Sequence, residues 1–271
     1  MTVDVKSLVE LGVAAAREAG ELARERRQAV ERMAVAATKS TPTDVVTESD
    51  TAAEKLIRER LLAARPGDAV HGEEGGHSAG DSGVVWVVDP IDGTVNYLYG
   101  IPQYSVSIAA QVDGVVEAGV VHNPVSGETW TAMRGSGALL DGEPIRVSGC
   151  TDLGLALVGT GFGYDAQRRA RQAAVLAEVV PRVRDIRRGG SAALDLCWVA
   201  CGRMDAYYER GLNPWDRAAG GLIAEEAGAV VSGLHGRPPG EAMTLAVSPG
   251  IEADLRALLE RLGADRDPQL P

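Results

Sequence analysis

The chain has 271 residues, of which 45% are hydrophobic and 24% are charged, and its formal net charge is −11. This length suffices for one large domain or two smaller ones, and the acidic balance argues against a general nucleic-acid or anionic-membrane binder. An apolar signal segment is missing at the start, no run approaches membrane-spanning length and cysteines are few, so we expect a cytoplasmic protein without membrane contact.

The first half of the chain changes from helical to strand periodicity. The patterns predict, in chain order, a helix over 5–33, a loop with a short extended piece over 40–50, a helix over 51–64 with Thr51 and Glu54 at capping-box spacing, and strands over 69–76, 84–88, 103–112 and 115–122. Residues 1–149 therefore indicate an α+β half in which two helices pack on an antiparallel sheet.

The second half, residues 150–271, alternates strands with helices. The patterns predict strands over 155–160, 183–187, 204–209, 229–231 and 244–248, and helices over 166–180, 191–201, 215–227 and 252–262. This alternation is typical of an α/β unit. We expect the two halves to share one site and to form one catalytic unit.

Two carboxylates follow the apolar strand at 84–88. Asp89 and Asp92 flank Pro90 and Ile91, and because proline fixes φ and lacks an N–H, the chain must turn there. Two acids on a rigid turn at the end of a buried strand are costly unless a positive charge lies between them. A divalent metal ion is the obvious candidate.

A second acid pair, Glu73 and Glu74, lies in a glycine-rich turn that is one loop and one strand earlier. Alone, these residues would be interpreted as solvated surface acids. However, neighbouring strand ends can bring both pairs together, and neither motif contains a compensating Lys or Arg. The set favours a hard cation, with Mg²⁺ as the first choice, although Ca²⁺ or Mn²⁺ would fit the same ligands.

Further acids have plausible local explanations, namely Asp44 in a turn, Glu209 at a strand end and Asp216 at a helix start. The four histidines form no recognisable arrangement with a Ser or Cys nucleophile, and there is no Walker-type phosphate loop. The chemistry that remains is hydrolysis of a phosphate ester by metal-activated water. Gly93 and Thr94, at an expected helix start, can offer backbone N–H groups to the phosphate.

The motif D-P-I-D-G-T at 89–94, with G-E-E at 72–74, W-D at 215–216 and the stretch 189–209, resembles the inositol monophosphatase family over nearly the whole chain. The resemblance implies a layered αβαβα sandwich of the sugar-phosphatase type. It also implies a Mg²⁺-dependent, lithium-sensitive phosphomonoesterase that is usually a homodimer, with two or three ions and Mn²⁺ as a possible substitute.

The resemblance also implies a role for each matching residue. The metal ligands are Glu73, Asp89, Asp92, Asp216 and the carbonyl of Ile91, with a weaker third ion held by Glu73 through water. The catalytic set is Glu73 and Thr94, which position the attacking water, and Asp44, which supports Thr94. The substrate contacts are Asp92, Gly93, Thr94, Ala192, Glu209 and Asp216. Lys39 lies where the family often has a basic residue beside a mobile loop.

The expected substrate is a small phosphorylated polyol, inositol 1-phosphate first. Relatives with similar motifs act on histidinol phosphate, fructose 1,6-bisphosphate or 3′-phosphoadenosine 5′-phosphate, and the Asn213-Pro214 loop before Trp215 faces the leaving group. Glu209 would repel a second phosphate but not an amine, so histidinol phosphate stays open. A regulatory protein that binds RNA polymerase or ribonucleoprotein is the non-enzymatic alternative, and the complete acid set argues against it.

Overall fold

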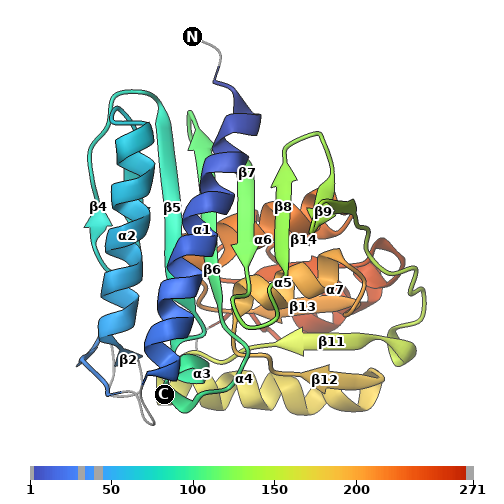
Figure 1. Cartoon of the computed structure of the whole chain (residues 1–271). Helices are drawn as coiled ribbons and strands as arrows, with labels where there is room; N and C mark the ends of the chain where they lie inside the picture. Colours follow the sequence, from blue (N-terminus) through green and yellow to red (C-terminus); the bar gives the residue numbers. More distant parts are fainter. Residues whose placement is uncertain (1–2, 30–33, 40–44, 267–271) are drawn as a thin grey trace.

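The computed structural model describes residues 3–29, 34–39 and 45–266, and these form five layers (Figure 1). Helices α1 (Val5–Gln28) and α2 (Glu48–Ala64) cover one face of the first sheet, and α5 (Ala192–Ala200) and α6 (Pro214–Glu226) lie between the two sheets. Helices α4 (Ala166–Val179) and α7 (Glu252–Arg261) cover the far face of the second sheet. The αβαβα sandwich is confirmed.

The first sheet is mostly an antiparallel meander. Its strands run, edge to edge, in the order β10 (Glu143–Pro144), β9 (Ala138–Leu140), β8 (Thr129–Met133), β7 (Val115–His122), β6 (Ser105–Val112), β5 (Val84–Asp92), β3 (Ala69–Gly72) and β4 (Gly76–His77). The exception is the parallel pair β3 and β5, whose carboxyl ends lie side by side. A separate hairpin pairs β1 (Ala37–Thr38) with β2 (Val45–Val46).

The second sheet is mixed. Its order is β12 (Asp185–Arg187), β11 (Leu157–Thr160), β13 (Ala206–Glu209), β15 (Thr244–Val247) and β14 (Val230–Ser232). Strand β11 is parallel to both of its neighbours, whereas β15 is antiparallel to β13 and β14. The second half is therefore parallel around β11, while its last two strands close the sheet in the antiparallel sense.

Strand β5 is buried on both faces, which explains its continuous apolar run. Trp86 and Val88 pack among side chains of α1 and α2, whereas Val87 packs toward α5 and α6. Because successive side chains of a strand point to opposite faces, this one strand contributes to two cores. Its carboxyl end is consequently held rigidly between the helical layers.

The predicted start of the second helix was wrong. Helix α2 begins at Glu48, with Thr47 as its N-cap and Asp50 as the acid that closes the capping box. Thr51 and Glu54 have the same spacing but lie one turn inside the helix, and the buried Glu54 accepts hydrogen bonds from the backbone N–H groups of Glu74 and Gly75 at 2.7 and 2.8 Å. The first predicted helix ends at Gln28, and residues 30–33 lie outside the described part.

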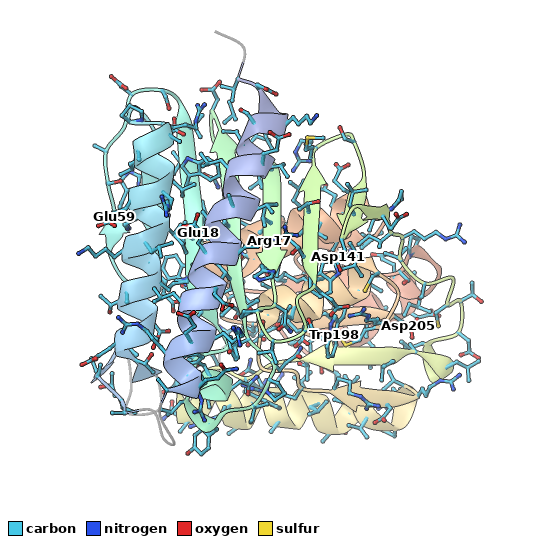
Figure 2. The ribbon with its side chains drawn as sticks, in the orientation of Figure 1. Arg17, Glu18, Glu59, Asp141, Trp198 and Asp205 are labelled. Atoms are coloured by element: carbon cyan, nitrogen blue, oxygen red, sulfur yellow. The ribbon has the colours of Figure 1, made fainter. Side chains whose placement is uncertain are left out.

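Polar contacts join neighbouring helices and strands, and three of the residues that form them, Arg17, Glu18 and Asp205, are labelled in Figure 2. Glu18 of α1 pairs with Arg60 of α2 at 2.7 Å, and Arg17 of α1 donates to Thr129 of β8 at 3.4 Å. Asp205 accepts from the Leu157 N–H at 2.7 Å, which fixes the start of β11. In the described residues, no helix combines the length and apolarity that spanning a membrane requires.

Candidate active site

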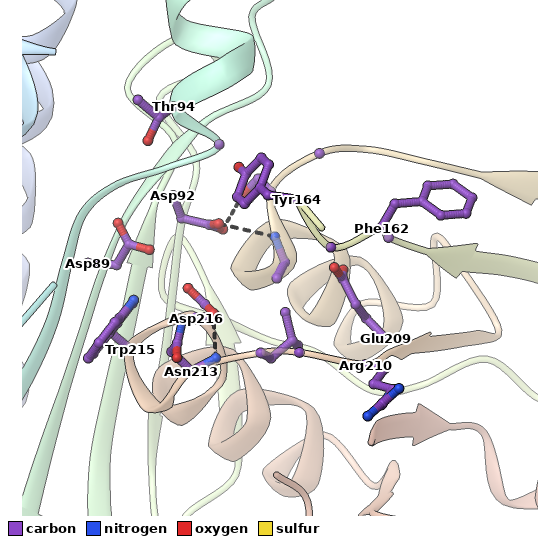
Figure 3. Close-up of a pocket in the computed structure, with 18 of the residues that line it drawn as sticks. Asp89, Asp92, Thr94, Phe162, Tyr164, Glu209, Arg210, Asn213, Trp215 and Asp216 are labelled. Atoms are coloured by element: carbon purple, nitrogen blue, oxygen red, sulfur yellow. Dashed lines mark hydrogen bonds between the residues drawn. The ribbon is translucent and has the colours of Figure 1, made fainter. Parts of the chain in front are cut away.

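A cavity of about 550 Å³ opens where the carboxyl end of β5 meets the amino ends of α5 and α6 (Figure 3). Its walls come from both halves of the chain. Those used below are Lys39, Glu73, Asp89, Ile91, Asp92, Gly93, Thr94, Ser191, Ala192, Glu209 and Asp216. Asp44 lies outside the described residues and Glu74 does not line this cavity, whereas the other residues predicted from the sequence to belong to the site all line it.

An irregularity in β5 determines the positions of the two central acids. Asp89 pairs with Ser107 and Asp92 pairs with Ser105, so β5 advances by one residue more than β6 between these pairs. In a regular strand, residues three apart point to opposite faces, but the extra residue cancels this alternation. Both carboxylates therefore reach the cavity.

Gly93 lets the chain leave β5 at once. Its φ of +96° is in the left-handed region, and a Cβ there would lie 3.1 Å from the carbonyl oxygens of Gln103 and Gly190. Only glycine meets both conditions without strain. Helix α3 (Thr94–Tyr99) starts directly afterwards, so the first N–H groups of this helix lie beside the acids.

Asp216 arrives from the other half of the molecule, on the first turn of α6. Its carboxylate accepts the Asn213 backbone N–H at 2.6 Å, which fixes the start of the helix. Among the described residues, Asp89, Asp92 and Asp216 each offer an oxygen such that all three oxygens lie within 4.8 Å of one another. Figure 3 shows these side chains converging on one point.

Such close carboxylates perturb one another. Burial raises the pKa of Asp89 well above its usual value, and the charges of Glu73, Asp92 and Asp216 raise it further. Burial likewise raises the pKa of Asp216 well above its usual value and that of Asp92 to about 6. Arg188 lowers the pKa of Asp92 by its charge, but no ion pair to the three aspartates is found among the described residues. The cluster therefore suits a hard divalent cation, which prefers carboxylate oxygens.

Glu73 follows β3 and lies beside the trio, because its backbone N–H donates to the Val88 carbonyl of the parallel strand β5 at 3.1 Å. Burial raises the pKa of Glu73 to about 7 despite a nearby cation. That cation is Lys39, whose Nζ lies 2.6 Å from Glu73 and 2.7 Å from Glu74. Neither acid motif contains a cation of its own, and the structure supplies one from a hairpin distant in sequence.

Thr94 has two acceptors for its single hydroxyl hydrogen. Its Oγ1 lies 3.1 Å from Asp50 Oδ1 and 3.1 Å from the Ile91 carbonyl oxygen. The family resemblance implied that Asp44 supports Thr94, but Asp44 lies outside the described residues, and Asp50 stands at the end of the predicted 40–50 loop. The S-D pair at a helix start was the available signal, but it also fits a simple cap, and Asp50 fulfils both roles.

The amino end of α5 holds Asp92 in place. Ser191, its N-cap, donates its hydroxyl to Asp92, and the backbone N–H groups of Ala192 and Ala193 donate at 3.3 and 2.8 Å. These bonds and the helix dipole offset part of the cost of burying this carboxylate. Ser191 was missed in the sequence because Gly-Ser-Ala before a helix is equally typical of an ordinary cap.

Glu209 lies across the cavity from Asp89 (Figure 3). It ends β13 and accepts a hydrogen bond from the Tyr207 hydroxyl. Burial raises the pKa of Glu209 to about 7, although this bond opposes the increase. One wall of the cavity thus concentrates negative charge, while the opposite wall offers a hydrogen-bond acceptor.

A comparison with models of protein families assigns the chain to one family. The model of the inositol monophosphatase family matches residues 4–269. The chain belongs to this family. Its membership, with the intact acid cluster, makes it a metal-dependent phosphatase, and the cluster formed by Asp89, Asp92 and Asp216 can hold the metal.

Individual relatives agree with this family. The chain is 53% identical to inositol-1-monophosphatase of Mycobacterium leprae, over 82% of this chain and 80% of that protein. It is 41% identical to Nus factor SuhB of Pseudomonas aeruginosa, over 86% and 87%. The structure of Mycobacterium tuberculosis SuhB matches with a TM-score of 0.84 and 45% identity, covering 98% of this chain and 100% of that one.

Proposed function

We propose that this protein hydrolyses inositol 1-phosphate to inositol and phosphate, with Mg²⁺ as its metal, or Mn²⁺ in its place. The observation that carries the proposal is the convergence of Asp89, Asp92 and Asp216 on one point. Such a cluster can bind divalent metal ions, and these ions supply the positive charge that hydrolysis of a phosphate monoester requires. The relative named a phosphatase is more similar, at 53%, than the one named a Nus factor, at 41%, which favours catalysis over a regulatory role.

The metal ligands are proposed as two overlapping sets. Glu73, Asp89 and the Ile91 carbonyl would hold one ion, and Asp89, Asp92 and Asp216 would hold the second. Glu73 would also support a weaker third ion through water. When bound, divalent ions supply positive charge for the leaving oxygen and lower the pKa of water to the neutral range.

The protein's own groups would then position the reactants. Glu73 and Thr94 orient the attacking water, and the N–H groups of Gly93 and Thr94 bind the phosphate at the start of α3. Asp92, Ala192 and Glu209 contact the hydroxyls of the polyol, which would lie toward the cavity wall that carries Glu209. Residues 1–149 and 150–271 form one catalytic unit in this proposal, because neither half contains all the ligands.

The oligomeric state and the cellular location are proposed from what is expected of the family. We infer that the protein forms a homodimer. Apolar side chains suited to such an interface are exposed at the end of α3, where Tyr99 and Ile101 are 74% and 47% exposed. The three cysteines are free, which suits the reducing cytoplasm. Lithium sensitivity is expected as in the family.

A phosphate-release panel tests the substrate. With Mg²⁺, inositol 1-phosphate is expected to be hydrolysed faster than fructose 1,6-bisphosphate and 3′-phosphoadenosine 5′-phosphate, because Glu209 disfavours a second anionic group. It is also expected to be hydrolysed faster than histidinol phosphate, which lacks the polyol hydroxyls that Asp92, Ala192 and Glu209 are proposed to contact. Li⁺ is expected to inhibit the reaction. A clear preference for histidinol phosphate would contradict the assigned substrate, and failure to release phosphate from any ester would contradict the activity.

The Asp50 contact to Thr94 gives a second test. Asp50→Asn is expected to lower kcat by about 10- to 100-fold, because the amide can satisfy either Thr47 or Thr94 but not both as an acceptor. Thr47→Ala is the matched control, since it removes the same helix cap, at about 1 kcal/mol, but leaves the contact to Thr94. Equal losses of kcat in the two variants would show that Asp50 acts only through the stability of α2.

A further inference from the structure

A second cavity, of about 250 Å³, lies between the two sheets beside α6. Its walls are mostly apolar and come from β7, α6, β14 and the segment before β15. They comprise Val116, Ala218, Gly221, Leu222, Val231, Pro239 and Thr244, with Arg134, Arg217 and Glu225 as the charged members. None of these residues lines the active-site cavity.

Arg217 is the unusual member of this set. Its Nε is buried and has no hydrogen-bond partner in the described residues. Asp216 is its neighbour in sequence, but consecutive side chains are about 100° apart around a helix, so Asp216 lines one cavity and Arg217 the other. A partly buried guanidinium without a partner is costly, and a bound anion would offset that cost.

The other two charges in the cavity already satisfy each other. Arg134 donates from Nε to the Val116 carbonyl at 2.9 Å, and its NH1 lies 3.3 Å from Glu225. The cavity therefore has one guanidinium that forms no ion pair with a carboxylate of the described residues, although the charge of Asp216 attracts it, and its other walls are mostly apolar. This pattern suits a single negative charge on an apolar body better than it suits a dianion.

We propose that this cavity is a binding site for a small organic carboxylate, whose carboxylate pairs with Arg217 and whose apolar part packs against Leu222 and Val231. Guanidinium and carboxylate groups match as two parallel hydrogen bonds, and this geometry favours a carboxylate over a neutral ligand. The volume accommodates a compound the size of an aromatic acid. The site is separate from the phosphatase centre and does not depend on the substrate proposed for it.

Gly221 allows the cavity to be blocked without touching Arg217. A Cβ on this helical glycine would meet only Val231 Cγ1, at 4.0 Å, and the backbone is not in the left-handed region. A larger side chain at 221 would therefore extend into the open cavity. Gly221→Leu fills the site sterically, whereas Arg217→Met removes its charge and keeps most of its length.

The experiment measures binding of benzoate to the full chain by titration calorimetry, with a chelator present so that the active-site acids hold no metal ion. We expect benzoate to bind, and benzamide, its neutral analogue, to bind at least about tenfold more weakly. Arg217→Met and Gly221→Leu are each expected to weaken benzoate binding at least about tenfold. Arg169→Met, which removes an exposed charge on α4, is expected to leave the affinity unchanged.

Three results would overturn the proposal: no binding of benzoate to the natural chain, equal binding of benzamide, or undiminished binding in Gly221→Leu. Thermal unfolding checks that each variant is folded. If Arg217→Met does not fold, the steric variant and the comparison with benzamide still decide, because neither alters the arginine.

Discussion

Replacing Asp89 with Asn is expected to abolish most phosphatase activity while making the metal-free protein more stable. Asp89 is buried, and Glu73, Asp92 and Asp216 all repel its charge. The amide keeps the shape and can still accept the Ile91 N–H, which lies 3.1 Å from Asp89 Oδ1. Because loss of a group that only supports a metal ligand already costs about 10- to 100-fold, loss of this proposed shared ligand should lower kcat by more than about 100-fold.

The stability of the Asp89→Asn variant shows whether Asp89 is a metal ligand or an acid that only stabilises the fold. Removing repulsion should raise the melting temperature of the chelated protein by about 2–4 °C for each kcal/mol gained. Saturating Mg²⁺ should stabilise the natural chain and have little effect on Asp89→Asn. The control is Glu241→Gln, since Glu241 lines the same cavity but is exposed and pairs with Arg168 at 3.7 Å. A destabilised but active Asp89→Asn would refute the assignment.

Contacts that are local in sequence were the predictable part of this molecule. The strand at Val115–His122 has its expected bounds. The five-layer fold was predicted from the family resemblance, and the solved relatives agree with it. The predicted turn at Pro90 was wrong, because β5 continues through Pro90 to Asp92 and the chain leaves the strand at Gly93. The hydrophobic period thus specifies the strand directly, whereas the proline does not end it.

Long-range pairings were the unpredictable part. The partner of Glu73 and Glu74 is Lys39, and the partner of Asp92 is Ser191, each contributed by a distant element. Hydrophobic periodicity indicates which face of a helix or strand is apolar. It does not indicate which polar group of another element a given side chain will contact. The irregularity in β5 is of the same kind, because it is visible only in the register against β6.

The burial of these carboxyls makes the metal-free protein sensitive to pH. In the folded state the pKa of Glu73 is about 7 and that of Asp92 about 6, mainly because of burial, compared with ordinary values of 4.5 and 3.8. Between the ordinary and the raised values, the folded state binds more protons than the unfolded state. The free energy of unfolding therefore falls as pH rises through this range.

We accordingly expect the melting temperature of the chelated protein to fall between about pH 5 and about pH 8, as these carboxyls are forced to ionise. Saturating Mg²⁺ should remove the fall, and its apparent affinity should increase with pH, since binding displaces protons. The buried His122 opposes this trend, because burial lowers its pKa. The double variant Glu73→Gln, Asp92→Asn retains His122 and should show a smaller decline, because Asp89, Asp216 and Glu209, whose pKa values burial also raises, remain. An equally steep fall in that variant would show that Glu73 and Asp92 do not contribute to the decline.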